Sequence, residues 1–250
     1  MKNLFLAAIT LTMSSLVLAG EATTIHWGYD QEIGAAHWGE LSEQYKTCST
    51  GKNQTPINIH HTYRIRDQHP IEINYQAAPK TIIFNGHTVQ VNTESERDYL
   101  QIEHEKFNLK QFHFHTPSEN QINGKNFPLE LHFVNQNAQG ELTVLAVMFK
   151  LGKENSEISK MWADISTEEN HPQPLRTQVN LTKLLPTQRN YYRFSGSLTT
   201  PPCSEGVTWI VLKQPLTLSE KQLEQFKDVL KQHSNNRPIQ PLNGRLIIED

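Results

Sequence analysis

The segment QFHFHTPSENQ, residues 111–121, alternates histidine with phenylalanine and then changes to turn-forming residues. Side chains of a strand alternate between its two faces, so Gln111, His113 and His115 are expected on one face. Phe112 and Phe114 are expected on the other, where they can pack into a core while the imidazoles face a cavity. A His-x-His pair alone is weak evidence for a metal site, because histidines also occur on strands that bind none.

The next strand-like run supplies a third histidine. Residues 128–135 read PLELHFVN, in which Glu130 and His132 share one face. The connection between the two runs, TPSENQINGKNFP, is rich in turn formers, so the strands can lie side by side and bring His132 to the same cavity. Three neutral imidazoles without a thiolate suit a catalytic zinc site with an open fourth position. Nickel or copper would also accept three imidazoles.

Two polar residues repeat one spacing around these histidines. Gln111 precedes His113 by two residues, and Glu130 precedes His132 by two, each on the face of its histidine. Such side chains can accept the second N–H of an imidazole and fix its orientation, so the spacing favours a metal site. A cupin motif is the alternative, with Glu119 as a ligand, but the Pro-x-Gly turn that it needs is missing before His132.

The N-terminus predicts export. Lys2, a mostly apolar run and the small-x-small pattern Val17-Leu18-Ala19 are typical of a removable secretory signal over residues 1–19. The apolar run is shorter than the ~20 residues that a membrane span needs. In a bacterium with two membranes, the destination would be the periplasm. Residues 20–250 contain no repeat or linker and are expected to form one domain.

The net charge limits the kinds of partner to be expected, and the cysteine count suggests a disulfide. Removing the signal takes Lys2 from the 23 basic residues and nothing from the 26 acidic ones, so the net charge changes from −3 to −4. This charge gives no reason to expect a nucleic acid or an anionic membrane as partner. The only cysteines are Cys48 and Cys203. In an exported chain an even count suggests a disulfide, with two separate buried thiols as the alternative.

Short β-type runs separated by turn clusters predict the fold. Several runs are almost continuously apolar, which fits strands buried on both faces of a large sheet. One helix is predicted from residue 220 to about 232, with Ser219 as its cap and Gln222 at the capping-box position. The predicted fold is mainly β, with a large, twisted, mostly antiparallel central sheet and short peripheral helices. The predicted strands are residues 81–84, 88–91, 107–115, 129–134, 142–151 and 207–212.

Together with SLTTPP at residues 197–202, the histidine pattern resembles that of an α-class carbonic anhydrase of the bacterial secreted type. The resemblance runs from HWGY at 26–29 to NGR at 243–245, nearly the whole chain after the predicted signal. It passes in the family's order through AHW at 36–38, QTPINI at 54–59 and NGH at 85–87. It implies the family's fold and the reversible hydration of carbon dioxide to bicarbonate and a proton, with weak hydrolysis of activated esters.

Carried over residue by residue, the resemblance implies one zinc ion held by His113, His115 and His132, with Gln111 and Glu130 as acceptors of imidazole N–H groups.

The same resemblance assigns Thr199, Glu119 and Thr200 to the reaction. Thr199 would accept a hydrogen bond from zinc-bound hydroxide and donate its own to Glu119, which then directs the hydroxide and is not a ligand. Thr200 would help to bind bicarbonate.

Further positions follow from the family's motifs. His87 matches the proton shuttle, and an imidazole titrates in the range this task requires. On residue type alone, His87 is as readily a surface histidine. Tyr29, Asn85 and Gln90 match positions that order a water chain. An apolar pocket for carbon dioxide would be formed by Val134, Val144, Leu198, Val207 and Trp209, which would otherwise be ordinary core residues.

The resemblance also implies a Cys48–Cys203 disulfide, inhibition by anions and sulfonamides, and a homodimer. One departure is Phe194, which stands where many members have a tyrosine of the network behind Thr199. Two other classes of protein compete with the enzyme: a non-catalytic binding module on this fold, and a periplasmic zinc-holding protein that would not need Thr199 and Glu119.

Overall fold

A computed structural model describes residues 25–65, 71–93 and 95–250. The predicted signal at residues 1–19 lies outside these ranges. Within them, no helix is long and apolar enough to cross a membrane.

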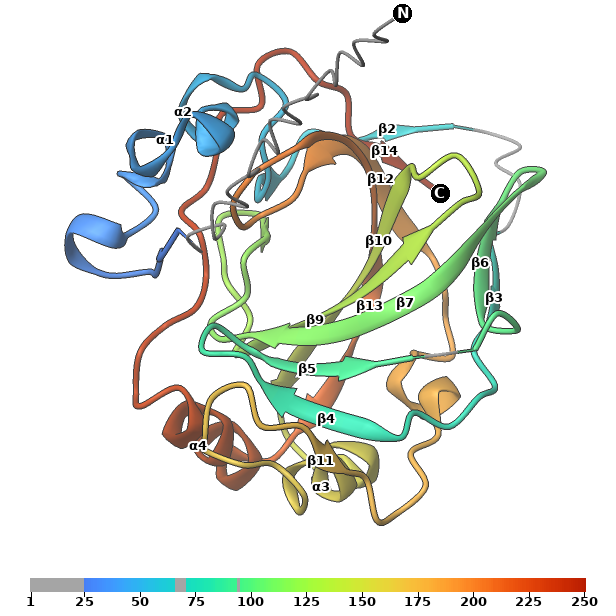
Figure 1. Ribbon diagram of the computed structural model, residues 1–250. Helices are drawn as coiled ribbons and strands as arrows, with labels where there is room; N and C mark the ends of the chain where they lie inside the picture. The colour runs from blue at the N-terminus through green and yellow to red at the C-terminus, as the bar shows by residue number, and fades with distance from the viewer. Residues whose placement is uncertain (1–24, 66–70, 94) are drawn as a thin grey trace, which may run out of the picture.

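A large twisted sheet dominates the molecule (Figure 1). Among the described residues it has twelve strands, in the order β11-β4-β5-β7-β9-β10-β13-β12-β14-β2, and β3 joins it through β6, which pairs with β7. Most neighbouring strands are antiparallel; the exceptions are β10 with β13 and β14 with β2. The prediction of a mainly β fold with a mostly antiparallel central sheet is therefore confirmed.

The strands of this sheet are β2 (Tyr63–Arg64), β3 (Glu72–Asn74), β4 (Thr81–Phe84), β5 (Val89–Asn92), β6 (Tyr99–Ile102), β7 (Glu105–His115), β9 (Leu129–Gln136), β10 (Leu142–Leu151), β11 (Gln173–Pro174), β12 (Tyr191–Ser197), β13 (Glu205–Leu218) and β14 (Ile248–Glu249). A separate pair is formed by β1 (Asn58–Ile59) and β8 (Gln121–Ile122). The helices are α1 (Trp38–Leu41), α2 (Thr47–Thr50), α3 (Ser156–Trp162) and α4 (Glu220–Val229), with 3₁₀ turns η1 (Gln31–Ile33), η2 (Glu43–Tyr45) and η3 (Leu181–Leu184).

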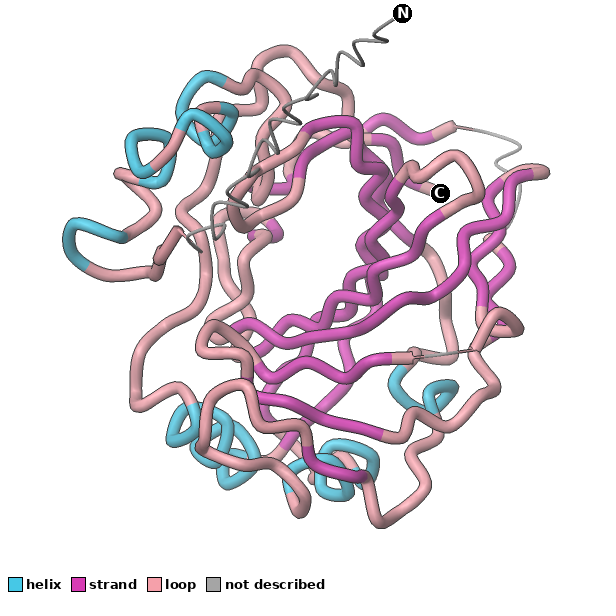
Figure 2. The backbone as a smooth tube through the Cα atoms, in the orientation of Figure 1, coloured by secondary structure: helices cyan, strands magenta, loops and turns pink. Residues whose placement is uncertain are grey.

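The central strands are buried on both faces, as their apolar sequences predict. On β10, Leu145 and Val147 belong to the larger apolar cluster, whereas Val144 and Ala146 belong to the smaller one on the opposite face. The larger cluster also contains residues of α3 and α4, which lie near β4 and β11 in Figures 1 and 2. The smaller cluster is next to the histidines. The sheet thus separates a purely structural core from the side that carries the site.

Helix α4 confirms the predicted cap but ends early. Ser219 and Gln222 form the reciprocal capping box. The helix stops at Val229, before the predicted residue 232, because Lys231 and Gln232 adopt left-handed φ angles of 55° and 64°. Such angles cannot continue a right-handed helix.

Candidate metal centre

Strands β7 and β9 bring the three histidines together. The strands are antiparallel, with His113 directly opposite His132 and His115 directly opposite Glu130. Phe112 and Phe114 are fully buried in the larger core on the other face. The two strands therefore lie side by side with the alternation of faces that the sequence predicts.

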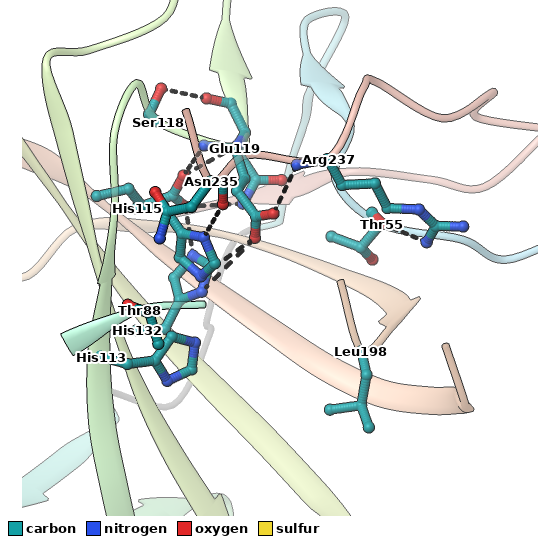
Figure 3. Close-up of polar contacts among 12 residues, drawn as sticks. Thr55, Thr88, His113, His115, Ser118, Glu119, His132, Leu198, Asn235 and Arg237 are labelled. Carbon is teal, nitrogen blue, oxygen red and sulfur yellow. Dashed lines mark hydrogen bonds and ion pairs between the residues drawn. The ribbon is translucent and has the colours of Figure 1, made fainter. Parts of the chain in front are cut away.

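The imidazoles converge on one point (Figure 3). One nitrogen from each of His113, His115 and His132 lies within 4.8 Å of the others. Burial lowers the pKa of all three rings, well below the usual range for His113 and His132, and the neighbouring imidazoles lower the pKa of those two further. The rings are therefore neutral near pH 7, the form that binds a metal ion.

The second nitrogen of each ring faces an acceptor. Nδ1 of His113 is 2.8 Å from Oε1 of Gln111. Nδ1 of His115 is 2.7 Å from the backbone oxygen of Asn235. These contacts favour the tautomers in which Nε2 of His113 and of His115 is free to coordinate.

In His132 the nitrogen that faces an acceptor is Nε2 and not Nδ1. Its Nε2 lies 3.0 Å from Oε1 of Glu130, although the two are not aligned as a hydrogen bond. Glu130 is held in turn by the backbone N–H groups of Glu119 at 2.7 Å and Asn120 at 2.9 Å, and by the Asn120 side chain. Burial raises the pKa of Glu130, and these hydrogen bonds partly offset that effect.

Glu119 lies beside the converging nitrogens but is not one of the group. Its Oε2 is 3.5 Å from Nε2 of His115 and 3.9 Å from Nδ1 of His132. Its Oε1 accepts a hydrogen bond of 2.9 Å from the backbone N–H of Arg237. Complete burial raises the pKa of Glu119 to about 8, against the lowering effect of Arg237 and of the Thr199 hydroxyl. No described residue makes a well-aligned hydrogen bond to Oε2.

Arg237 holds this carboxylate through its backbone and contacts a distant part of the chain through its side chain. Its buried guanidinium donates hydrogen bonds to Gln54, to the carbonyl of Thr55 and to the carbonyl of Cys48. Burial lowers the pKa of Arg237 to about 10, which the charge of Glu119 partly offsets. The charge is kept buried because oxygen acceptors satisfy both terminal nitrogens.

The residues expected to receive carbon dioxide lie together in the smaller apolar cluster. The indole of Trp209 packs edge-on against His132, with ring centroids 4.9 Å apart, and its Nε1 donates to the carbonyl of Ser197. Phe194 stacks on the same indole. The residues of the predicted pocket that belong to this cluster are Val134, Val144, Leu198, Val207 and Trp209.

His87, Tyr29 and Asn85 come from segments outside β7 and β9, whereas Gln90 on β5 is directly opposite His113. The ring of His87 stacks on Trp27, with centroids 3.7 Å apart and planes inclined by 7°. Nδ2 of Asn85 donates to Gln90 over 3.4 Å. The Tyr29 hydroxyl is buried and has no hydrogen-bond partner in the described chain. Burial, followed by the charge of Glu119, raises the pKa of Tyr29 well above its usual value.

The predicted disulfide between Cys48 and Cys203 is present, with 5.0 Å between the Cα atoms. The N–H of Cys203 donates to the carbonyl of Thr200, and its carbonyl accepts from the Gln54 side chain. The bond therefore attaches the segment that carries Thr199 and Thr200 to α2.

Asn235 and Arg237 contact the site in a way that the sequence did not reveal. Both touch the site through backbone atoms in an irregular segment after α4, where no periodicity marks a role.

The residues fit a zinc ion. Nε2 of His115 is buried and, among the described residues, has no hydrogen-bond partner. An orphaned buried nitrogen costs free energy unless something binds it. A metal ion would satisfy it together with the two neighbouring imidazoles, and a neutral His₃ set is a catalytic zinc donor set.

Comparisons with known proteins agree with this geometry. The family model for eukaryotic-type carbonic anhydrases matches residues 33–250. A carbonic anhydrase of Pectobacterium atrosepticum is 50% identical over 242 residues, which cover 96% of this chain and 98% of the relative. A solved α-carbonic anhydrase of Thermovibrio ammonificans, in complex with the inhibitor sulfanilamide, is 47% identical with a TM-score of 0.87, covering 90% and 99% of the two chains. The chain therefore belongs to the eukaryotic-type, or α-class, carbonic anhydrase family of enzymes.

Proposed function

We propose that the protein catalyses the zinc-dependent, reversible hydration of carbon dioxide to bicarbonate and a proton. The observation that carries the proposal is the convergence of His113, His115 and His132 within 4.8 Å, with an outer acceptor for each ring. One zinc ion per chain would be held by these three nitrogens. Zinc supplies Lewis acidity that lets water ionise near neutral pH, of which carbonic anhydrase is the standard example.

Glu119 and Thr199 orient the attacking oxygen. The Glu119 side chain accepts from the backbone N–H of Arg237, and the nearby Thr199 hydroxyl lowers its pKa. A metal ion beside it would favour its charged carboxylate form, to which the Thr199 hydroxyl could donate. With its proton directed at Glu119, the Thr199 hydroxyl presents a lone pair to the site. It can then accept a hydrogen bond from water, and so select one orientation of that water.

The apolar cluster beside His132 would accommodate the substrate. Carbon dioxide is uncharged and gains by leaving water for an apolar surface. Val144, Val207 and Trp209 are almost fully buried, whereas Val134 and Leu198 are half-buried and offer the accessible part of that surface. Thr200, also half-buried, would hydrogen-bond bicarbonate through its hydroxyl.

His87 would carry the product proton to solvent. Its ring is half-buried beside Trp27, and it borders a cavity of about 370 Å³ that Tyr29 and Asn85 also line. Tyr29, Asn85 and Gln90 supply the polar groups that can order water along the way.

Stopped-flow measurements of carbon dioxide hydration on the zinc-loaded protein test the proposal. We expect activity well above buffer, lost when the zinc is chelated and regained when it is restored. An inactive protein with one zinc bound per chain would contradict it and would favour a zinc-holding or binding module.

The shuttle is tested separately. His87→Ala should slow turnover in weak buffer and be rescued by added imidazole, because the imidazole replaces the missing base. His171→Ala is the control, since His171 is an exposed histidine with no expected role. An unchanged rate in His87→Ala would remove the assignment.

Further properties are proposed from the same resemblance. We expect weak hydrolysis of activated esters, and inhibition by anions and sulfonamides at the metal. Export to the periplasm is supported by the predicted signal and by the Cys48–Cys203 disulfide, which suits an oxidising compartment. Fractionation would test the location, and sedimentation would test the proposed homodimer.

A further inference from the structure

The turn that carries His87 is held rigidly. Oδ1 of Asn85 accepts from the backbone N–H groups of His87 and Thr88, and Gly86 adopts a left-handed φ of 86°. The carbonyl of His87 accepts from Nδ2 of Asn235, whose own carbonyl holds His115. The backbone of the turn is therefore fixed relative to the three histidines.

An acidic residue from a remote segment covers this turn. Glu169 lies between α3 and β11 and forms an isolated β-bridge with Phe84. The backbone N–H of the next residue, Asn170, donates to the carbonyl of Phe84. Oε2 of Glu169 lies 3.2 Å from the point that a Cβ on Gly86 would occupy. Oε1 accepts from Nζ of Lys231 at 3.3 Å. The carboxylate therefore packs against Gly86, next to His87, and pairs with Lys231, which follows α4.

The charges around His87 differ in sign. The cavity beside it is lined by His26, Glu169 and Lys231, together with Asp30 and His233, whose Oδ2 and Nδ1 lie 2.7 Å apart. Lys231 and Glu169 neutralise one another in part. Burial lowers the pKa of His87, His26 lowers it further, and Glu169 raises it. Glu169 is therefore the acid that opposes the loss of a proton from the ring.

We propose that Glu169 is a positioning residue of the proton-transfer step: its carboxylate, docked on the 85–87 turn, favours the protonated form of the His87 ring. The inference rests on the proposed function, in which His87 accepts the product proton. A shuttle with too low a proton affinity accepts slowly, so an anion at this point compensates for the burial of the ring.

The test measures the His87 ring directly and the reaction separately. In the zinc-loaded protein, NMR titration of His87 should give a lower pKa in Glu169→Gln than in the wild type, by about 0.2–0.7 unit for a partly exposed charge pair. Lys231→Gln should shift it upward, because it leaves the Glu169 charge unopposed. Glu168→Gln is the matched control: Glu168 is an exposed neighbouring acid whose backbone N–H donates to Ser166, and its replacement should leave the titration unchanged.

Kinetics then separate this inference from the proposed function. The pH profile of kcat in weak buffer should move with the His87 titration in Glu169→Gln and Lys231→Gln, while kcat/KM for carbon dioxide stays as in the wild type. Equal His87 titrations in all variants would overturn the role of Glu169, even in an active enzyme. Absence of hydration activity in the wild type, with the predicted shifts present, would overturn the proposed function but leave the electrostatic role of Glu169.

Discussion

Gln111 shows how a single neutral side chain orients an imidazole of the three-histidine cluster. Its Oε1 accepts from Nδ1 of His113 at 2.8 Å and thereby directs the other ring nitrogen toward the site. Gln111→Ala should weaken zinc binding by about 10–100-fold, because the ring loses its fixed tautomer and orientation. Competition with a chelator measures this change. Gln101→Ala, which removes an amide bonded only to a nearby backbone carbonyl, should bind zinc like the wild type. Equal affinities for both variants would contradict the role of Gln111.

Some residues of the site could be predicted from the sequence and others could not. Alternation along two strands was sufficient to place Gln111, His113 and His132 on one face, because a strand fixes the direction of every second side chain. Asn235 and Arg237 could not be found this way. They contribute a backbone carbonyl and a backbone N–H, which every residue possesses, so only the path of the chain reveals them.

At the scale of elements, apolar runs predicted the central strands and missed strands of more polar sequence. β4 and β10 have the predicted bounds, since their burial shows directly in the sequence. β12 reads YYRFSGS, with an arginine, two serines and a glycine among its apolar residues, so no run marks it. Its pairing with β13 and β14 comes from long-range contacts. Helix α3 is only seven residues long and is stabilised by its cap and by packing, not by an extended periodic pattern.

The first turn of α3 leads to a prediction about pH. Glu157 stands in its first turn, where Oε2 accepts from the backbone N–H of Asn180 at 2.8 Å and from Nζ of Lys160 at 2.8 Å. Burial alone would raise the pKa of Glu157, but these hydrogen bonds outweigh it, and the pKa is lowered. The charged form therefore stabilises the fold above the unfolded pKa of about 4.3, and that contribution is lost as pH falls through the lower folded value.

Glu157→Gln should accordingly lower the free energy of unfolding by about 1–2 kcal/mol at pH 7, the usual contribution of charge-assisted hydrogen bonds. The difference from the wild type should disappear in acid, and urea unfolding at a series of pH values measures it. Glu224→Gln on α4 removes a comparable pair with Lys227 that is largely exposed, so it should change stability by less than about 0.5 kcal/mol. A pH-independent loss in Glu157→Gln would show that the shape of this side chain, not its charge, stabilises the first turn of α3.

At the scale of the whole molecule, a network of buried contacts joins segments that are far apart in sequence. Arg237 reaches Cys48, Gln54 and Thr55 through its side chain and Glu119 through its backbone. Gln54 continues the network to the carbonyl of Cys203 and to Glu205, at the start of β13. The disulfide closes it covalently, between residues separated by 155 positions. The network therefore links the segment that carries Thr199 to the buried contacts that stabilise the whole fold.

Removal of the disulfide tests this connection. A Cys48→Ser/Cys203→Ser variant should lose about 2–5 kcal/mol of stability, because the unfolded chain is released from a very long closed loop. Hydration activity of the zinc-loaded variant should also fall, since Thr199 and Thr200 lose their covalent attachment to α2, while zinc affinity stays near that of the wild type because none of the three histidines is in the network. A reducing agent should reproduce both losses in the wild type and leave the variant unaffected. A stability loss with full activity would confine the disulfide to folding and separate Thr199 from the network.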